Sequence, residues 1–413
     1  MRVVAGGPGG SIEVLDGYRA AGRSGSRLVP IDEAGLLPLP EEATLVHLPG
    51  RRPLAVDSGG GAVEVDGEWT AVAAVLPVGH LRTLLPATAR NRDAHRLPLF
   101  GYTAVVEHDG DLACAALRTD TFPWWQPANF ARTDLPDAVA AARVALPGNR
   151  LVDHLAVCAL ENRCYTAQNT FHRRYEGALP ASPACNADCL GCISLQTDGA
   201  VPAPQERMRF APTADELVAV ADWHLRGEEA AMVSFGQGCE GEALTRDDAL
   251  VEATRRIHAM HPGATIHVNS NGSKPHILER LIDAGLNSLR ISAISFTDAV
   301  FRPYYRPVGY GLDDVLQCGR LMHARGGQVC LNLLTFPGVT DVGAELEATV
   351  AACRGMGVDQ VQWRSLNVDH DWLLEVLPVM PEAIGMGAAF DRVRELLPGV
   401  EHGNFTRPVA APA

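Results

Sequence analysis

The chain has 413 residues, 47% hydrophobic and 20% charged, so it is long and apolar enough for one large domain with an appendage or for several ordinary domains. Its 35 basic and 49 acidic residues give a net charge of −14, which argues against wholesale binding to a nucleic-acid backbone. The start lacks a basic region followed by a long apolar run, and no uncharged apolar run reaches about 18 residues. We therefore expect no signal peptide, no membrane span and a cytoplasmic location, which the ten dispersed cysteines also favour.

Residues 1–130 have the pattern of a small β-rich domain. Asp66-Gly67 and Asp109-Gly110 each stand between two runs of β-forming residues. A type I′ turn needs positive φ at both central positions, which Asp-Gly tolerates, so both pairs predict hairpins. Residues 131–178 are predicted as a helical connector, with 151–175 as its longest helical stretch.

Farther along the chain, helical stretches alternate with short apolar runs. Thr213 and Glu216 form a capping box at the start of one helix. The predicted strands are 230–235, 264–268, 288–292, 328–334 and 360–363, and the helices between them are 247–261, 274–285, 312–325 and 342–356. This alternation favours parallel βαβ units, closed or half-closed. We assign them to a domain over 179–370, followed by a C-terminal helical extension and tail over 371–413.

Three cysteines, Cys185, Cys189 and Cys192, fall within eight residues in the spacing C-x3-C-x2-C. Thiols this close indicate a metal site. Structural zinc usually has four protein ligands in two separate pairs, and here the fourth would have to be Cys164 or His172. An iron–sulfur cubane held by three cysteines would leave one iron open for another ligand. The spacing alone leaves both choices.

Further motifs follow the triplet in a fixed order. They are "SFGQGCEGEAL" with Gly241-Glu242 after the second strand, "HVNSNGS" at the third, "RISAIS" at the fourth and "TFPGVTD" after the fifth. With the triplet ahead of them, residues 180–370 resemble the radical S-adenosylmethionine (radical SAM) superfamily. The resemblance implies an α/β fold, a partial (β/α)6 TIM-like barrel of radical SAM type, here with an N-terminal β-rich domain and a helical connector.

The resemblance also implies the chemistry. A 4Fe–4S cluster would be held by Cys185, Cys189 and Cys192, and its open iron would chelate the amine and carboxylate of S-adenosylmethionine. One electron, from a donor such as flavodoxin or ferredoxin, would cleave the sulfonium to give a 5′-deoxyadenosyl radical. That radical would abstract hydrogen from a substrate, and the charge favours a small molecule or a peptide.

The cofactor contacts implied by the resemblance lie in the loops after the strands. Glu242, beside Gly241, would accept the methionyl ammonium, with Glu240 as the competing acceptor. Gly272 would allow a close backbone approach. The polar residues expected to meet the ribose or carboxylate, or alternatively to cap strand ends, are Asn269, Asn271 and Ser292.

Other candidate residues have two interpretations each. Strand alternation places Arg364 and Gln362 on one face, where they would reach substrate or cofactor or form an ion pair at the rim. Arg306 belongs to an aromatic stretch that suits a lid or a surface turn. Cys239 and Cys330 would donate hydrogen to a substrate radical or pack in the core.

One position departs from the family pattern. An aromatic residue often precedes the last cysteine and packs on the adenine, but here that residue is Gly191. Two other functions are kept as alternatives to the small-molecule or peptide enzyme. One is an RNA-modifying radical SAM enzyme, and the other is a non-catalytic module in which the cysteine triplet binds zinc and staples a loop.

Overall fold

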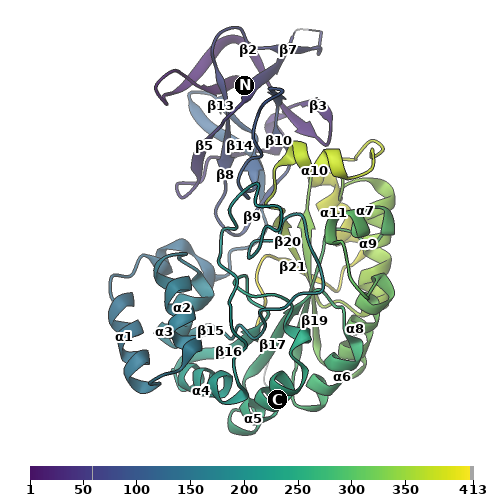
Figure 1. Cartoon of the computed structure of the whole chain (residues 1–413). Coiled ribbons are helices and arrows are strands. Elements are labelled where there is room, and N and C mark those ends of the chain that lie inside the picture. Colours follow the sequence, from purple (N-terminus) through teal and green to yellow (C-terminus); the bar gives the residue numbers. More distant parts are fainter. Residues whose placement is uncertain (58, 410–413) are drawn as a thin grey trace.

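A computed structural model describes residues 1–57 and 59–409 of the chain. Two sheets organise these residues (Figure 1). An antiparallel sheet of 14 strands occupies the N-terminal part, and a parallel sheet of seven strands forms the rest. The helices of the second part cover the outer, convex face of the parallel sheet, as expected of a half-closed α/β barrel (Figure 1).

The N-terminal sheet consists of short strands joined by turns. Its strands are β1 (Arg2–Gly6), β2 (Ile12–Ser24), β3 (Arg27–Pro30), β4 (Leu36–Pro38), β5 (Thr44–Leu48), β6 (Arg51–Val56), β7 (Ala62–Glu64), β8 (Thr70–Val75), β9 (His80–Arg82), β10 (Leu85–Pro86), β11 (Thr88–Arg90), β12 (Tyr102–Thr103), β13 (Val105–His108) and β14 (Asp111–Arg118). Short 3-10 turns, η1 (Glu33–Gly35), η2 (Pro123–Trp125) and η3 (Pro127–Phe130), complete this part.

One of the two predicted hairpins is confirmed and the other is wrong. His108 pairs with Asp111 across Asp109 and Gly110, whose φ values are 53° and 96°. The strands beside Asp66-Gly67 do not pair with each other, because β7 joins β6 while β8 joins β1, β5 and β12. Gly67 has φ 108° but Asp66 does not have positive φ, so the type I′ turn does not form, and partners from elsewhere in the chain pair with both strands.

The connector contains three helices, α1 (Leu135–Ala145), α2 (Arg150–Leu160) and α3 (Tyr165–His172). The single helical stretch predicted over 151–175 is wrong in two places, because it is interrupted at 161–164 between α2 and α3 and it ends before residue 175. The chain leaves α3 at Arg173 with φ 53°, and β15 (Arg174–Ala178) follows as the first barrel strand. Parallel pairing with β16 (Glu229–Phe235) overrides the local helical pattern. The barrel sheet therefore begins inside the predicted connector, and the domain boundaries remain our proposal.

The barrel sheet runs in strict sequence order from β15 to β21, and every neighbouring pair is parallel. Its other strands are β17 (Thr265–Ser270), β18 (Ser288–Ala293), β19 (Gln328–Thr335), β20 (Gln360–Ser365) and β21 (Glu401–Gly403). Its helices are α4 (Ala214–Leu225), α5 (Asp247–Met260), α6 (Pro275–Asp283), α7 (Asp298–Tyr305), α8 (Leu312–Ala324), α9 (Gly343–Met356), α10 (His370–Val376) and α11 (Met386–Leu396), with the 3-10 turn η4 (Ala243–Thr245). The predicted strands and helices from residue 210 to 363 are confirmed, as is the Thr213–Glu216 capping box. Within the described residues, no helix is long and apolar enough to cross a membrane.

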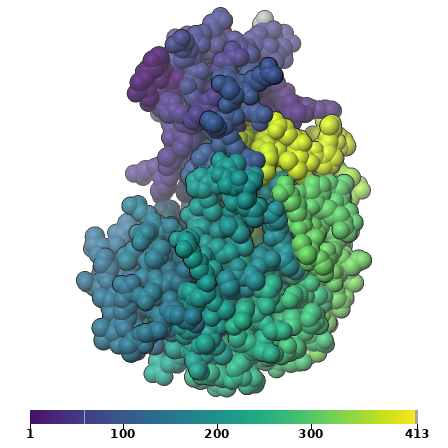
Figure 2. Space-filling view, in the orientation of Figure 1, coloured from purple at the N-terminus to yellow at the C-terminus, as the bar shows by residue number. Residues whose placement is uncertain are grey.

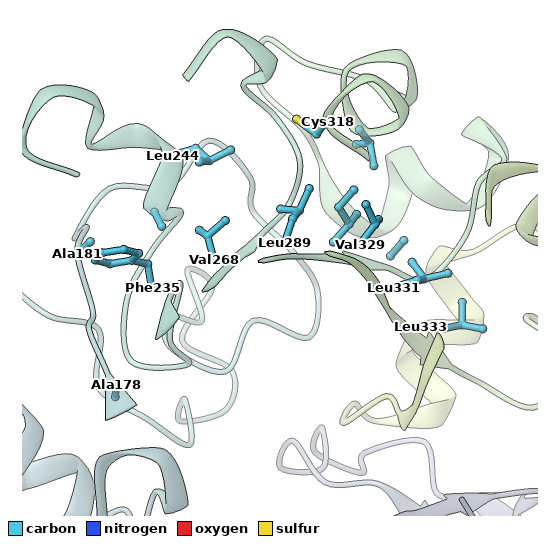
Figure 3. Close-up of a cluster of buried hydrophobic side chains, with 14 of the residues drawn as sticks. Ala178, Ala181, Phe235, Leu244, Val268, Leu289, Cys318, Val329, Leu331 and Leu333 are labelled. Carbon is cyan, nitrogen blue, oxygen red and sulfur yellow. The ribbon is translucent and has the colours of Figure 1, made fainter. Parts of the chain in front are cut away.

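Strand alternation divides the barrel sheet into an apolar face and a polar face. Leu289, Val329 and Leu331 pack toward the helices in the main hydrophobic core (Figure 3). The residues between them point to the concave side. That face is polar, and its members are Glu176, Ser234, His267, Asn269, Arg290, Ser292, Cys330, Asn332, Gln362 and Arg364. A polar concave face suits a barrel that admits polar ligands rather than one filled with apolar side chains.

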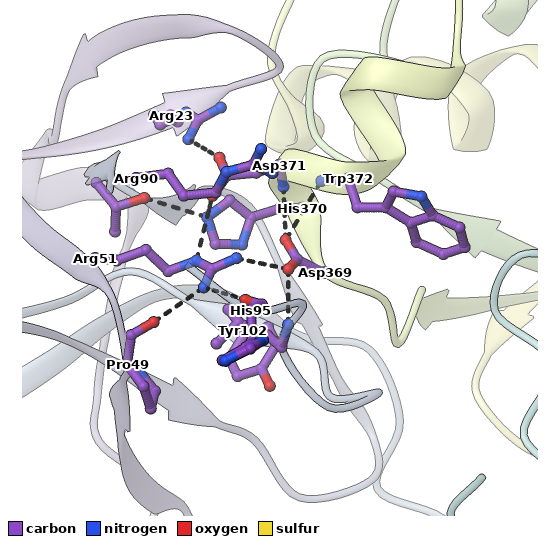
Figure 4. A network of polar contacts seen from close by, with 12 residues as sticks. Arg23, Pro49, Arg51, Arg90, His95, Tyr102, Asp369, His370, Asp371 and Trp372 are labelled. Carbon is purple, nitrogen blue, oxygen red and sulfur yellow. Dashed lines mark hydrogen bonds and ion pairs between the residues drawn. The ribbon is translucent and has the colours of Figure 1, made fainter. Parts of the chain in front are cut away.

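The N-terminal sheet contacts the loops that follow the last barrel strands. Arg51, which is 1% exposed, binds Asp369 through Nη2 and Oδ2 at 2.6 Å (Figure 4). Arg82 donates to the Leu366 carbonyl at 2.8 Å. Arg96 pairs with Asp198 at 2.7 Å, beyond the cysteine loop. In the space-filling view the N-terminal part rests on the α10 segment (Figure 2). Because these loops lie at the carboxyl ends of the strands, the N-terminal part forms one rim of that end of the barrel.

Burial of His224 predicts acid sensitivity. The ring lies in α4 against Gly177, where an added Cβ would be 2.6 Å from Cγ, and burial lowers its pKa to about 4. The unfolded chain takes up this proton below pH 6.5 and the folded chain does not. Stability is therefore fully present above pH 6.5 and falls between 6.5 and about 4, by about 1.4 kcal/mol per pH unit. In urea unfolding at several pH values, His224→Leu should show a shallower fall than the wild type, and equal slopes would contradict this.

Candidate active site

The cysteine loop follows the first barrel strand and is held by backbone hydrogen bonds. Asp188 N donates to Tyr305 O at 3.1 Å, Leu190 N to Tyr304 O at 3.0 Å, and Val308 N to Asn186 O at 2.9 Å. The segment that holds the loop ends α7 and follows β18. Backbone hydrogen bonds therefore hold the loop in place. Its three thiols are half-buried and free, so they are available as ligands.

The thiols of the loop lie in an environment that disfavours free thiolates. Burial raises the pKa of Cys189 well above its usual value, and the neighbouring Cys192 and Cys185 raise it further. Arg207 supplies a cation at this point, with Nη2 at 3.3 Å from Cys192 Sγ. Among the described residues, the three side chains whose ligand atoms all lie within 4.8 Å of one another are His154, Cys158 and Cys239. The sulfurs of the cysteine loop are farther apart than this.

Gly191 is explained by what packs against it. A Cβ there would lie 2.8 Å from the Tyr304 hydroxyl and 3.3 Å from the Asn367 carbonyl oxygen. Tyr304 is buried and comes from α7, while Asn367 follows β20. The side chain that the family pattern expects at this position is therefore excluded by tertiary packing, and the aromatic groups beside the loop come from the segment after β18.

Glu242 lies between the cysteine loop and the end of β17. Its carboxylate accepts hydrogen bonds from Ser270 Oγ at 2.6 Å, Asn271 N at 2.8 Å and Leu244 N at 3.1 Å. Burial raises its pKa, while the Ser270 hydrogen bond opposes that effect. The side chain is thus oriented by groups from two strand ends.

Glu240 is occupied differently. Its carboxylate accepts from three backbone N–H groups, those of Ala181, Ser182 and Gln237, at 2.6–2.8 Å. Burial raises its pKa to about 7, against the effect of these bonds. Through these hydrogen bonds, Glu240 connects the segment before the cysteines to the loop after β16. Of the two glutamates, Glu242 is the one that faces the other candidate residues.

The "NSNG" motif joins Glu242 to the cysteine loop. Asn271 Nδ2 donates to Asn186 Oδ1, inside the cysteine loop, at 3.0 Å. Gly272 has φ 71°, and a Cβ there would lie 3.1 Å from Val315 Cα, so glycine allows both the turn and the close approach of α8. Three elements predicted from separate motifs therefore meet at one place: the cysteine loop, Glu242 and Asn271-Gly272.

The remaining predicted residues are not all in this cluster. Asn269 Nδ2 donates to the Phe235 carbonyl, and Ser292 Oγ accepts from Asn332. Arg364 donates to the Asn404 carbonyl at 2.6 Å, deeper on the concave face. Arg306 ends α7 with φ 46° and pairs with Asp188 at 3.2 Å. Their cofactor roles stay predictions.

The two cysteines predicted as hydrogen donors lie on opposite sides of the sheet. Cys330 stands on the concave face beside Arg290, with which it is paired in register. Cys239 is buried in the hydrophobic core and lies next to Cys158 of α2. Cys330 is therefore the better placed of the two for contact with a ligand in the barrel.

Sequence reasoning gave Tyr310 no individual role. Its hydroxyl is buried and, among the described residues, has no hydrogen-bond partner. Burial raises its pKa, and the charges of the nearby Cys189, Glu242 and Cys185 raise it further, so the hydroxyl is near both the cysteine loop and Glu242. The aromatic stretch "FRPYYRPVGY" (301–310), which contains Arg306, predicts a lid or a surface turn, and only the packing singles out this tyrosine. A buried hydroxyl without a hydrogen-bond partner is expected where a polar ligand binds.

Comparison with known proteins agrees with this geometry. Residues 179–351 match the model of the radical SAM superfamily. No curated protein matches the chain by sequence. Among solved structures, methylornithine synthase is similar at 17% identity over 64% of this chain and 77% of that chain, with a TM-score of 0.40. A radical SAM methyltransferase from Sphaerobacter thermophilus is similar at 16% over 55% and 64%, TM-score 0.39. Streptococcus suis SuiB bound to precursor peptide SuiA is similar at 12% over 60% and 49%, TM-score 0.38.

A cysteine loop at the carboxyl ends of parallel strands, on a partial TIM-like barrel, defines a class of metal-dependent α/β enzymes. The matched segment specifies the class: residues 179–351 are a radical SAM domain, and the protein that carries it is an enzyme. A radical SAM domain implies an iron–sulfur cluster and S-adenosylmethionine.

Proposed function

We propose that this enzyme binds a 4Fe–4S cluster at Cys185, Cys189 and Cys192 and uses S-adenosylmethionine to remove a hydrogen atom from a small-molecule or peptide substrate. The observation that carries the proposal is the meeting of the cysteine loop, Glu242 and Asn271 through the Asn186–Asn271 hydrogen bond. When bound, the cluster and cofactor supply one-electron cleavage of the sulfonium to methionine and a 5′-deoxyadenosyl radical.

The spacing of the cysteines favours a cluster over one ion. Sulfur ligands on three corners of a cubane lie farther apart than ligands of a single zinc ion. The loop's sulfurs fall outside the 4.8 Å grouping that single-ion ligands satisfy, within the described residues. Arg207 beside Cys192 would offset the negative charge of thiolate ligands. The zinc-binding alternative for this loop is thereby disfavoured.

Named side chains would orient the cofactor. Glu242, already held by Ser270 and two backbone N–H groups, would accept the methionyl ammonium. Tyr310 would donate its free hydroxyl to a cofactor oxygen. Gly272 would let the backbone approach the nucleoside closely. Packing by the α7 segment and the N-terminal rim would exclude water from the site.

The charge of the concave face points to an acidic group on the substrate. Arg290 and Arg364 are both on this face, against Glu176, which accepts from Ser234. Burial lowers the pKa of Arg364 to about 9, so it is still protonated at neutral pH. Arg290 Nε has no partner among the described residues. A substrate carboxylate would satisfy this excess positive charge. The net charge of −14 argues against the RNA-modifying alternative.

Anaerobic reconstitution tests the proposal. Protein incubated with iron, sulfide and a reductant should turn brown, and with dithionite and S-adenosylmethionine it should form 5′-deoxyadenosine and methionine. A colourless protein that retains zinc at the three cysteines and leaves the cofactor intact would overturn the proposal. Isotope transfer from deuterated candidate carboxylates into 5′-deoxyadenosine would then identify the substrate.

Substitution of the two glutamates separates their roles. Glu242→Gln removes a charge-assisted contact and should weaken binding of S-adenosylmethionine to the reconstituted protein by about 10- to 100-fold. Glu240→Gln should mainly lower the thermal midpoint, because its carboxylate binds three backbone N–H groups. Equilibrium dialysis and thermal unfolding measure both. A larger loss of affinity in Glu240→Gln would reverse the assignment.

A further inference from the structure

A second cluster of metal-ligating side chains lies between helix α2 and the loop that follows β16. His154, Cys158 and Cys239 each offer one ligand atom, and these atoms all lie within 4.8 Å of one another. His154 and Cys158 are one turn apart on α2, so they share a face of the helix. Cys239 comes from the loop between β16 and Glu242. Neither the proposed cluster nor the proposed cofactor contacts use His154 or Cys158.

The distances suit a single small ion. Two sulfurs bound to tetrahedral zinc lie about 3.8 Å apart, and a sulfur and a nitrogen about 3.5 Å apart. The distance from Cys158 Sγ to His154 Nε2 is 3.8 Å, and the third ligand atom is within 4.8 Å of both. A shift of less than about 1 Å would therefore close the geometry around an ion. The ligand atoms of this trio lie closer together than the three sulfurs of the cysteine loop, which are not all within 4.8 Å of one another.

The surroundings of the trio are those of a buried structural site. Cys158 and Cys239 are 1% and 2% exposed. The ring of His154 packs edge-on against Phe210, and the Cys239 carbonyl accepts from Met208 N at 2.8 Å, so the segment over 208–210 covers the cluster. Two thiolates and a neutral imidazole around a divalent cation give no net charge, which is the favourable way to bury these groups.

The backbone of another cysteine contacts the trio. Cys164 precedes α3 as its N-cap residue, and its backbone N–H donates to the Cys158 carbonyl at 2.9 Å. The fourth position of a tetrahedral ion would be taken by this thiol or by water. Nitrogen and thiolate donors in this ratio are typical of zinc and are not chosen by magnesium or calcium.

We infer that His154, Cys158 and Cys239 form a zinc site that ties helix α2 of the connector to the loop carrying Glu240 and Glu242. The ion would brace the connector against that loop from outside the barrel, on the side away from the concave face. In this assignment Cys239 is a metal ligand rather than a hydrogen donor. The site is independent of the proposed iron–sulfur cluster.

The test removes the competing thiols first. In the full-length variant Cys185→Ala/Cys189→Ala/Cys192→Ala, loaded with zinc under reducing conditions and dialysed, elemental analysis should find about one zinc per chain and no iron. Adding Cys158→Ser should lower zinc to below about a tenth of that value, whereas Cys353→Ser, a buried thiol in α9, should leave it unchanged. Absence of zinc, retention of zinc after Cys158→Ser, or iron in its place would overturn the inference.

Cobalt gives a second readout, which reports the type of ligand atom directly. The chelator-treated triple variant, with the trio intact, should develop sulfur-to-cobalt charge-transfer absorption and intense tetrahedral bands on titration with Co²⁺. At saturating cobalt, the charge-transfer intensity should fall in Cys239→Ser by about half where water holds the fourth position, and by about a third where Cys164 holds it. No thiolate absorption, or a Cys158–Cys239 disulfide in reduced protein, would overturn the site. Iron content of the wild type tests the proposed function separately.

Discussion

Replacing Cys189 with alanine should abolish formation of 5′-deoxyadenosine, reducing it to the level of a protein-free control. Cys189 is the middle thiol of the loop, and both of its neighbours approach closely enough to raise its pKa. A cluster on three protein ligands that loses one has two protein thiolates left, so both iron content and electron transfer should be lost. Cys185→Ala and Cys192→Ala should behave in the same way.

The measurements for this prediction are iron and sulfide content after anaerobic reconstitution, the electron paramagnetic resonance signal of the reduced protein, and 5′-deoxyadenosine by chromatography. Cys353→Ser is the matched control, because it removes a buried thiol from α9, away from the loop. It should keep the cluster and the cleavage activity. Full iron content in any of the three loop variants would mean that the cluster ligands are assigned wrongly.

Replacing Arg51 with methionine should destabilise the protein by about 3–5 kcal/mol, since it leaves a buried carboxylate without its cation. The side chains of Arg51 and Asp369 are both 0% exposed and lie 2.6 Å apart. Arg51 also donates to the Pro49 and His95 carbonyls at 3.0 and 2.9 Å, and Nε reaches Asp371 at 3.3 Å (Figure 4). The bonds to Asp369 and Asp371 hold the N-terminal sheet against the start of α10, and the bonds to Pro49 and His95 orient the guanidinium within the N-terminal part.

Urea unfolding measures this cost, with Arg52→Met as the matched control in the same strand. Arg52 pairs with Glu64, but both side chains are about half exposed, so its loss should cost less than about 1 kcal/mol. The double variant Arg51→Met/Asp369→Leu should recover part of the stability, because the uncompensated charge is gone. An equal loss of unfolding free energy in Arg51→Met and Arg52→Met would show that the buried pair contributes no more to stability than the exposed pair.

Local patterns in the sequence predicted two kinds of element: helices and turns stabilised by residues near in the chain, and strands that are fully buried. The barrel strands are short apolar runs between amphipathic helices, and helix starts such as Thr213–Glu216 carry their own capping groups. The Asp109-Gly110 hairpin follows from the turn itself. The order of the motifs along these elements was enough to indicate the superfamily, which the match over 179–351 bears out.

Features that depend on distant partners could not be predicted in this way. The sequence of β15 has the pattern of a helix end, and it becomes a strand only by pairing with β16. The strands beside Asp66-Gly67 pair with other strands instead of with each other. Gly191 makes sense only once Tyr304 and Asn367 fill the space that a side chain would need. Tyr310 and the trio His154, Cys158 and Cys239 come from segments far apart in the chain. Their proximity is a product of tertiary packing, because spacing along a chain constrains side chains only within one helix, strand or turn.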